Sequence, residues 1–413
     1  MSRQNSKTTV AIIGGGVTGS TTALVLSEAG YKVILIEKGD LGNGASSRSV
    51  AAFRQQFSTE VSVRGMRYAR KWFEHFGARC GEPVYYPRGY LFAYRDPEKF
   101  QDACELNEAQ QSWGLHDAGV LTPKQVKSQF PYMGEHLAGA TWCPTDGFLR
   151  PEVIYREAAT MAAMSGAVIL KNTEVIASKK NGTAITHLIT QHLSPGGYHN
   201  ETIPVDMVIN ASGFWTPHNV AKVFGCSPLP ITPEQVFIYL LEHGETNVSS
   251  WPFIAAESGA YCRPDLTSTK IVLGWVKKTR SVGMEFDDEE QDRVKPEFSY
   301  RNPDGYGHLM WSEVANWVPI TANMGLAGMG QGVYDTTPDH NPIIDWDSNV
   351  PNLIHAVGFS GHGVMHAPFT ASILKHFLDV GEKRWTMMVD GSPVDLGAFS
   401  IDRSFSCGEK KVL

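Results

Sequence analysis

The chain has 413 residues, which is too long for one ordinary hydrophobic core and predicts about two domains. Hydrophobic residues make up 42% and charged residues 19%, so the composition is that of a globular protein and excludes global disorder. The net charge of −7, with no block of five or more like charges, argues against a nucleic-acid partner.

The cysteines and the N-terminus bear on the cellular compartment. The first nine residues, MSRQNSKTT, lack the apolar segment of a secretory signal, and no run of about eighteen apolar residues predicts a transmembrane helix. The cysteines form no C-x-x-C pair and have no histidine spaced to complete a zinc site; they are Cys80, Cys104, Cys143, Cys226, Cys262 and Cys407. We therefore expect free thiols, no metal and a cytoplasmic location.

The first forty residues have the pattern of a dinucleotide-binding unit. Residues Thr9–Ile13, TVAII, predict a buried parallel strand, and the turn GGGVTG that follows opens a predicted helix. In that turn Gly14 allows the tight bend, Gly16 lets a pyrophosphate approach the backbone, and Gly19 lets the helix pack on the strand. The N-terminus of the helix then favours the phosphates through its free N–H groups and its dipole.

A second predicted strand, YKVILI, ends at Glu37, 18 residues after Gly19. A carboxylate at this position can accept hydrogen bonds from both ribose hydroxyls of adenosine and would repel a 2′-phosphate, which disfavours NADP. These residues do not separate FAD from NAD. The next segment, GDLGNGASSRS, favours FAD, because its small residues and hydrogen-bond donors suit a second phosphate or a ribityl chain. A solvated loop is the alternative.

Three separated blocks resemble the D-amino-acid oxidase-like superfamily of FAD enzymes. They are AIIGGGVTGS through EKGDLGNGASSRS, then VINASGFW, and finally GVYDTTPDHNPIID with HAVGFSGHGVMHAP. Together they span almost the whole chain. Within the superfamily, SVAAFRQQFS and VDLGAFSIDRSF look most like the branch of sarcosine oxidase and dimethylglycine dehydrogenase.

The resemblance implies an α/β fold in which a Rossmann-like FAD-binding domain is interleaved with a smaller α+β substrate domain on a mostly antiparallel sheet. The FAD-binding domain would comprise residues 1–85, 146–228 and 325–413, and the substrate domain residues 86–145 and 229–324. Along the chain, the patterns predict helices over residues 60–76, 97–113 and 146–166, a strand over 167–178 and strand-rich sequence over 235–275.

The same resemblance implies a set of FAD-binding residues, which lie in the three blocks and at Val175, whose backbone would contact the adenine. This set is Gly14, Gly16, Val17, Thr18, Gly19, Glu37, Lys38, Ser46, Ser47, Arg48, Val175, Ala211, Ser212, Gly213, Trp215, Gly332, Tyr334, Gly361, His362, Gly363 and Val364. A sarcosine oxidase bonds its flavin covalently through a cysteine at the position of Gly332, so the glycine predicts FAD that is held without a covalent bond.

A helix is predicted from Gly363 onward, and its first N–H groups could face the pyrimidine edge of the flavin and stabilise the charge that develops near N1. His362 and His366 lie four residues apart, on one face of that helix. With no H-E-x-x-H pattern and no third ligand nearby, we expect no metal site. We expect catalytic histidines that pack or hydrogen-bond beside the flavin, where either could tune the protonation of the amine.

Arg54 and Tyr261 are the expected substrate residues. Arg54, in AAFRQQF, aligns by resemblance with the arginine that binds the carboxylate of sarcosine, and a surface or structural arginine is the alternative. Tyr261, in Y-x-x-P, falls where the family has a substrate-side tyrosine, with an ordinary strand aromatic as the alternative. Two family lysines are absent. Val272 stands near the position of the oxygen-activating lysine, and Met365 replaces a second carboxylate-binding lysine.

The sequence thus predicts an FAD-dependent amine or amino-acid oxidase or dehydrogenase, with oxygen or another electron acceptor as its second partner. It would oxidise a C–N bond by hydride transfer to flavin N5. Three alternatives remain: an FAD hydroxylase, disfavoured because NASG stands where that class has an acidic G-x-D-G motif; an assembly flavoprotein; and an oligomer or subunit of a dehydrogenase complex.

Overall fold

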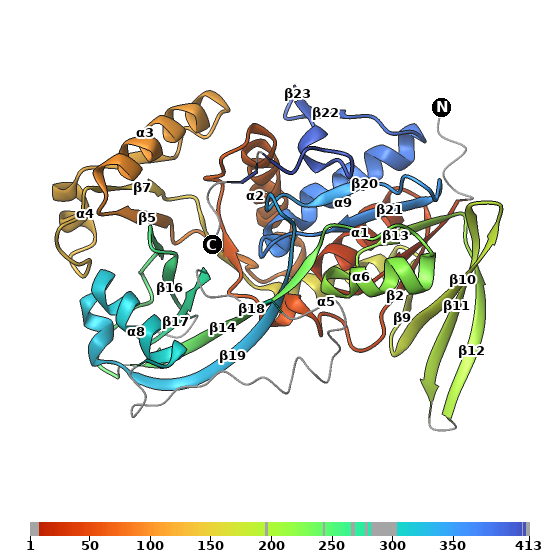
Figure 1. Ribbon diagram of the computed structural model, residues 1–413, viewed down its shortest axis with the longest axis horizontal. Coiled ribbons are helices and arrows are strands. Elements are labelled where there is room, and N and C mark those ends of the chain that lie inside the picture. Colours follow the sequence, from red (N-terminus) through yellow and green to blue (C-terminus); the bar gives the residue numbers. More distant parts are fainter. Residues whose placement is uncertain are drawn as a thin grey trace.

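The computed structural model describes residues 8–194, 197–242, 244–265, 269–276, 280–281, 304–406 and 408–409. Two large sheets organise this part of the chain, one on each side of the molecule in Figure 1. Cys407 lies outside the described residues, whereas the other five cysteines are free thiols. Among the helices of the described ranges, none combines the length and the apolar character that crossing a bilayer requires.

The first sheet is the predicted Rossmann-like unit. Its strands are parallel except for β20, which pairs antiparallel with β21. In spatial order they are β20 (Ile343–Trp346), β21 (Leu353–Val357), β13 (Met207–Asn210), β1 (Thr9–Ile13), β2 (Lys32–Ile36) and β9 (Val168–Leu170). The first predicted strand is therefore confirmed, at the centre of the sheet.

Both faces of this sheet are covered, which explains why its strands are almost wholly apolar. Val10 and Ile12 of β1 point into a core shared with the helices of one face, which are α1 (Val17–Glu28), α2 (Glu60–Cys80), α5 (Pro151–Met164) and α9 (Gly363–Val380). Ala11 and Ile13 point the other way, onto the meander of β10 (Thr173–Asn181), β11 (Ala184–Ser194) and β12 (Gly197–Pro204). This meander projects at the right of Figure 1.

The second sheet is mostly antiparallel, as predicted for the substrate side, with one parallel pair between β15 and β5. Its strands in the described residues are β18 (Arg280–Ser281), β14 (Thr232–Glu242), β17 (Lys270–Trp275), β16 (Ala260–Pro264), β15 (Phe253–Ala256), β5 (Tyr90–Tyr94), β7 (Gly139–Cys143) and β6 (Gly119–Leu121), with β19 (Gly325–Thr336) paired to β14.

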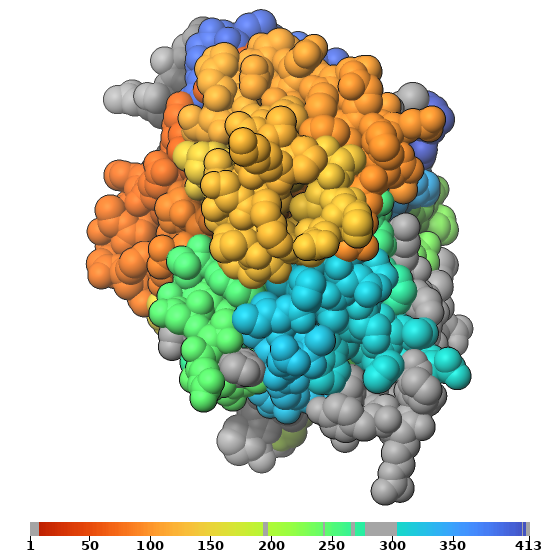
Figure 2. All heavy atoms as spheres, turned by 90° about the vertical axis from the view of Figure 1, so that its left-hand side faces the viewer, coloured from red at the N-terminus to blue at the C-terminus, as the bar shows by residue number. Residues whose placement is uncertain are grey.

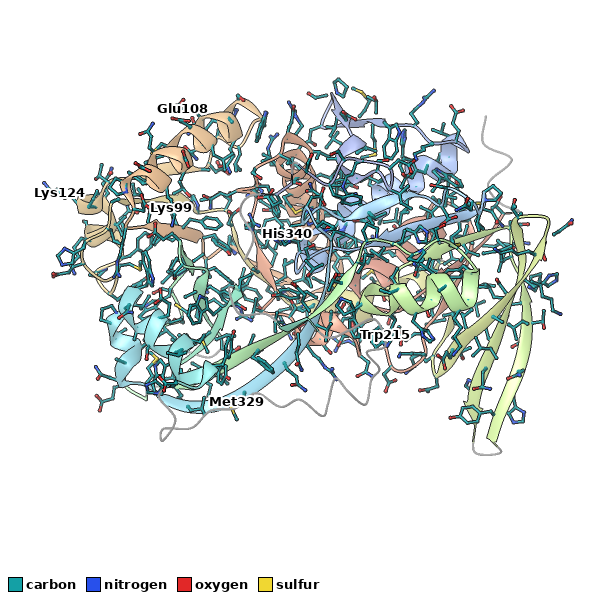
Figure 3. All side chains as sticks on the ribbon, in the orientation of Figure 1. Lys99, Glu108, Lys124, Trp215, Met329 and His340 are labelled. Carbon is teal, nitrogen blue, oxygen red and sulfur yellow. The ribbon has the colours of Figure 1, made fainter. Side chains whose placement is uncertain are left out.

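Helices from distant parts of the sequence cover the outer side of this sheet. They are α3 (Pro97–Ser112), α4 (Pro123–Gln129), α8 (Tyr306–Trp317) and the short 3-10 turn η6 (Pro319–Asn323). Figure 2 shows the segment of α3 and α4, in orange to gold, directly against the blue segment that contains α8. Arg95 Nη2 donates to the Asn316 carbonyl at 2.6 Å across this boundary, and Glu108 and Lys124 lie on the outside (Figure 3).

Small elements connect the two sheets and carry the site. A three-stranded sheet of β3 (Ala52–Phe53), β8 (Gly147–Leu149) and β4 (Tyr85–Tyr86) lies between them. The remaining elements are η2 (Ala45–Arg48), η3 (Gly213–Trp215), α6 (Thr216–Asn219), η4 (Val220–Phe224), β22 (Thr386–Val389), β23 (Ser392–Asp395) and η7 (Gly397–Phe399).

Three sequence predictions differ from the structure in their bounds. The helix predicted over 146–166 begins only at Pro151, since β8 precedes it, and the helix predicted over 60–76 continues to Cys80, where Gly81 caps it at φ 74°. The strand predicted over 167–178 divides into β9 and β10, because Asn172 takes φ 50° and turns the chain from the Rossmann sheet into the meander.

The predicted division into domains also meets one structural difference. Its last boundary, at residue 325, falls at the start of β19, which pairs with β14 over almost its whole length. A strand and its ladder partner belong to one folding unit, so we propose that the last FAD segment begins after Thr336. The other boundaries stay predictions.

Candidate active site

A cavity of about 850 Å³ lies along the carboxyl ends of the Rossmann strands. Ile13, Ile36 and Ala211, at the ends of β1 and β2 and just after β13, line it together with the start of α9. Ligands of open α/β sheets bind at this edge, and pockets for small molecules and cofactors reach about 1,000 Å³. The cavity is therefore large enough and correctly placed for a dinucleotide.

The glycine-rich turn shapes one wall of the cavity. Gly14 has φ 107°, and a Cβ on it would overlap the Ala211 carbonyl group, while a Cβ on Gly19 would overlap the carbonyl oxygen of Gly14. Helix α1 starts after Gly16 with no side-chain cap from that residue, and the Val17 N–H donates to Ser46 Oγ at 3.0 Å. The turn thus leaves backbone room and a helix N-terminus facing the cavity, which fits a pyrophosphate.

Glu37, Lys38 and Trp215 line one part of the cavity, beyond the end of β2. The Glu37 carboxylate accepts from the Gly15 N–H at 2.7 Å and from the Gly39 N–H at 2.9 Å, so it is held at the end of β2. The Lys38 ammonium sits 3.9 Å from the centroid of the Trp215 ring, and Trp215 lies beside α6 (Figure 3). These residues fit the adenosine part of FAD, with Glu37 as the acceptor for the ribose.

Most of the predicted FAD residues line this cavity. The lining members are Gly14, Gly16, Val17, Thr18, Glu37, Lys38, Ser46, Arg48, Val175, Ala211, Ser212, Gly213, Trp215, Gly332, Tyr334, Gly361, Gly363 and Val364. Outside the lining are Gly19, which packs α1 on the turn, and exposed Ser47, whose hydroxyl donates to the Gly44 carbonyl at 3.4 Å. His362 also lies outside it and faces Arg54 instead.

The loop before α9 closes the far end of the cavity. Asp335, at the end of β19, accepts from the Gly358 N–H at 2.7 Å, and its carbonyl accepts from the Ser360 N–H at 3.1 Å. Burial raises the pKa of this carboxyl to about 6. Asp335 thereby shapes the loop that presents Gly361 and Gly363 to the cavity, a role the sequence reasoning missed.

Arg54 lies buried between β3 and the start of α9. Its Nη2 donates to His362 Nε2 at 3.1 Å, its Nη1 donates to the Gln56 carbonyl at 2.9 Å, and its guanidinium stacks 3.9 Å from the Phe57 ring centroid. The same Nη1 lies 3.9 Å from Oε1 of Glu409, and both side chains are 1% exposed. The surface alternative for Arg54 is therefore wrong. It is a buried cation whose surroundings bring together residues from three distant segments, at positions 54–57, 362 and 409.

Arg54 and the helix backbone determine the tautomers of the two histidines. Because Arg54 has only donors, His362 must accept at Nε2, and His366 Nδ1 donates to the His362 carbonyl at 3.2 Å. Burial, followed by Arg54, lowers the pKa of His362 well below its usual value, and burial lowers that of His366 to about 4. Both side chains are neutral near pH 7. In the described residues, no group of three or more ligating side chains could hold a metal ion.

His366 is expected to make stability depend on pH. Its folded pKa, about 4, lies below the unfolded value near 6.5, so its contribution is present above pH 6.5 and is lost as pH falls toward 4. The loss reaches about 2 kcal/mol at pH 5. Urea unfolding of the FAD-loaded protein should therefore show His366→Gln gaining relative stability by that amount between pH 7 and pH 5.

Exposed His116 supplies the control, since His116→Gln makes the same chemical change at the surface and leaves the buried site intact. Asp335 changes the stability of the protein in the opposite sense, because its raised pKa makes the folded state more stable as pH falls through 6. Each variant is therefore compared with the wild type at the same pH. A constant difference between His366→Gln and wild type would contradict the assignment.

Tyr261 belongs to an aromatic row on the second sheet. Phe253 stacks on Tyr90 with ring centroids 4.3 Å apart and on Tyr261 at 5.5 Å, and the Tyr261 hydroxyl donates to Tyr334. Burial raises the pKa of Tyr334 to about 12 and raises that of Tyr261 well above its usual value. These phenols stay protonated at physiological pH. Since Tyr334 lines the cavity, the hydrogen bond links Tyr261 to its flavin end.

The positions that depart from the family pattern are closely packed in the structure. Val272 and Met365 are both buried, so each is an apolar packing residue at a place where the family has a charged lysine. A Cβ on Gly274 would overlap the Tyr261 hydroxyl, so the glycine provides the space for that ring. Gly332 lines the cavity, with Arg48 O 3.2 Å from the place of a Cβ.

Sequence reasoning also missed Tyr90 and Glu409. Tyr90 is fully buried and pairs in register with Phe253, but nothing in YLFAY distinguishes it from an ordinary strand aromatic. Glu409 reaches Arg54 across 355 residues of sequence, and no local pattern signals such a contact.

The fold and the cavity define the class of this protein as an α/β protein with a dinucleotide-binding, Rossmann-like sheet. The model of the DAO family, described as FAD dependent oxidoreductase, matches residues 9–376. The chain therefore belongs to this family of FAD-dependent oxidoreductases, and its cofactor is FAD.

Individual relatives agree with this placement. FAD-dependent oxidoreductase domain-containing protein 1 of Xenopus laevis is 25% identical over 96% of this chain and 82% of its own length. Mitochondrial dimethylglycine dehydrogenase of Rattus norvegicus is 23% identical over 90% of this chain, and the match spans 43% of that protein. The structure of L-proline dehydrogenase from P. horikoshii superposes with a TM-score of 0.81 at 24% identity, covering 96% of this chain and 97% of its own.

Proposed function

We propose that this protein oxidises the C–N bond of an amino acid or N-alkylated amino acid to an imine, which water then hydrolyses. The relatives that support this substrate class are named for dimethylglycine and L-proline. The observation that carries the proposal is Arg54, a buried guanidinium beside the helix that begins at the flavin end of the cavity. A buried cation at this place suits the carboxylate of an amino acid.

The residues of this chain would bind and orient rather than transfer protons. FAD supplies the hydride acceptor, its N5 atom, when it occupies the cavity. Arg54 would hold the substrate carboxylate, and the protonated Tyr334, which accepts the hydrogen bond of Tyr261, would border the reacting carbon with its own hydroxyl donor. Neutral His362 would keep the guanidinium in place by accepting its hydrogen bond. Such positioning supplies a large part of the rate in reactions that need no strong base.

We also propose that FAD is held without a covalent bond, because Gly332 offers no side chain at the attachment position of the cysteine-linked relatives. Its binding would depend on the turn from Gly14 to Gly19 and on Glu37. Released flavin should therefore appear in the supernatant after acid precipitation. Flavin that stays with the protein pellet would contradict this.

Anaerobic mixing tests the proposed activity. The FAD-loaded protein is mixed with sarcosine, dimethylglycine, L-proline and a set of D- and L-amino acids, and the flavin absorption band is followed. At least one carboxylated amine is expected to bleach the band, while the matching amine without a carboxylate should do so far more slowly. If no amine bleaches the band, the catalytic proposal fails and a non-catalytic assembly role is favoured.

The electron acceptor is tested by repeating the active case in air. Buried Val272 stands near the position of the family's oxygen-activating lysine, so we propose an acceptor other than oxygen. Slow reoxidation by oxygen and fast reoxidation by an artificial quinone acceptor are expected. Rapid reoxidation in air would identify an oxidase instead.

A further inference from the structure

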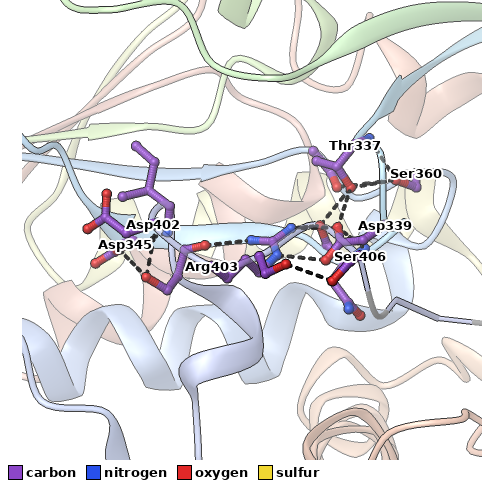
Figure 4. Close-up of polar contacts among 12 residues, drawn as sticks. Thr337, Asp339, Asp345, Ser360, Asp402, Arg403 and Ser406 are labelled. Carbon is purple, nitrogen blue, oxygen red and sulfur yellow. Dashed lines mark hydrogen bonds and ion pairs between the residues drawn. The ribbon is translucent and has the colours of Figure 1, made fainter.

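The last described residues of the chain form a segment that returns to Arg54. After η7, residues 400–406 make turns without a helix or strand, and Arg403 anchors them on Asp339. Its Nε donates to Asp339 Oδ2 and its Nη2 to Oδ1, both at 2.8 Å, and Nη2 also donates to the Asn341 carbonyl at 2.7 Å. Figure 4 shows this network, which continues through Thr337 to Ser360.

Beyond this anchor the chain is seated closely on the backbone of Asp339. A Cβ on Gly408 would overlap the Asp339 carbonyl, and the Glu409 N–H donates to that carbonyl at 3.0 Å. The Glu409 carboxylate accepts from the Ser58 N–H, at 2.9 Å from Oε2 and 3.2 Å from Oε1. Arg403, Gly408 and the Ser58 N–H therefore hold one carboxylate beside the buried guanidinium of Arg54.

The position of that carboxylate conflicts with a second one. Glu409 is a buried anion beside the guanidinium proposed to bind the substrate carboxylate. Two carboxylates around one buried guanidinium repel each other, because little solvent screens their charges. A substrate carboxylate can therefore pair with Arg54 only where the Glu409 carboxylate has moved away.

We infer that Glu409 is an internal carboxylate ligand of Arg54, which occupies the position proposed for the substrate carboxylate and competes with that carboxylate. This inference rests on the proposed function, since it assigns a specificity-determining residue to the same pocket. Displacement of Glu409 breaks no helix or sheet ladder, because residues 400–406 and 408–409 belong to none. Arg403 would keep the segment anchored while Glu409 moves. Glu409 Oε1 lies 3.9 Å from Arg54 Nη1. A ligand whose carboxylate forms closer, two-point hydrogen bonds with the Arg54 guanidinium would therefore displace Glu409.

Binding of propionate, a carboxylate that the enzyme cannot oxidise at a C–N bond, tests this inference. FAD-loaded wild type and Glu409→Gln are titrated with propionate at pH 7.5 by calorimetry, and the flavin spectrum reports changes at the cavity. Glu409→Gln is expected to bind propionate at least about tenfold more tightly than wild type, because the competing charge is gone while the side-chain volume is kept. Propionamide, which has no charge, should bind all variants alike.

Two further variants separate competition from a general effect. Glu382→Gln removes one acidic side chain from an exposed position and should leave propionate affinity unchanged. Adding Arg54→Gln to Glu409→Gln should abolish the gain. If Glu409→Gln fails to retain FAD, Glu409→Asp, with a shorter carboxylate, is measured instead and should give a smaller gain of the same sign.

The inference is overturned if propionate binds Glu409→Gln no more tightly than wild type, if it binds neither protein, or if propionamide gains as much. This binding assay does not depend on turnover. Failure of every amine to bleach the flavin would therefore end the proposed function, while a tenfold gain for propionate would still establish the competition at Arg54.

Discussion

Gly19→Ala is expected to abolish stable FAD binding. The added Cβ would overlap the carbonyl oxygen of Gly14, so helix α1 would have to move off the turn whose backbone N–H groups face the phosphates. An alanine that forces such a shift costs about 1–3 kcal/mol in packing alone, and the misplaced N–H groups add to this. We expect FAD affinity to fall by at least about 100-fold. Reconstitution of the apoprotein with FAD, followed by its absorption and fluorescence, measures this.

Gly119→Ala provides the matched control for that experiment. A Cβ at Gly119 would meet no atom within 4 Å, and its φ is not left-handed, so the same chemical change should leave FAD affinity as in wild type. The thermal midpoint of Gly19→Ala should also stop responding to added FAD, because ligand stabilisation requires binding to the folded state. A variant that purifies with full FAD would show that this helix does not position the cofactor.

Arg54→Gln is expected to cause the largest loss of activity, about 100-fold or more in kcat/KM for an amine that carries a carboxylate. The substitution removes a charge-assisted, buried contact, and truncating such a pair typically costs 2–5 kcal/mol. Arg54→Lys should recover only part of the loss, since an ammonium keeps the charge but lacks the planar fork. Steady-state kinetics are measured with a carboxylated amine and with its decarboxylated analogue. The loss in kcat/KM should appear only with the carboxylated amine.

Stability provides an independent readout for Arg54. In Arg54→Gln, Glu409 is left buried without this cation, so the variant should unfold at lower urea concentration, and adding Glu409→Gln should restore part of the loss. Arg64→Gln, which removes a surface pair with Glu60, controls for the loss of one arginine and should change neither activity nor stability appreciably. Equal losses for both amine substrates would contradict a carboxylate-binding role.

The cofactor part of this protein was readable from the sequence because its determinants are local. A strand, a G-x-G-x-x-G turn, a helix and an acidic residue occur within forty residues, and the chemistry of each can be judged from its neighbours in the chain. The structure has β1 over Thr9–Ile13, as predicted, and places Glu37 at the end of β2 in the cavity. Helix ends were less well predicted, because β8 and the end of α2 are decided by packing between the sheets.

The sequence by itself determined the dinucleotide-binding unit and the mixed α/β architecture, and its family resemblance implied FAD and made Arg54 and Tyr261 substrate candidates. Only the tertiary structure decided what surrounds them. Arg54 meets His362 from the start of α9 and Glu409 from the far end of the described chain, and Tyr261 reaches the cavity through Tyr334. The physical reason is that these contacts join residues tens to hundreds of positions apart, where no periodicity or spacing carries information. The charge balance of a buried pocket is therefore known only once the chain has folded around it.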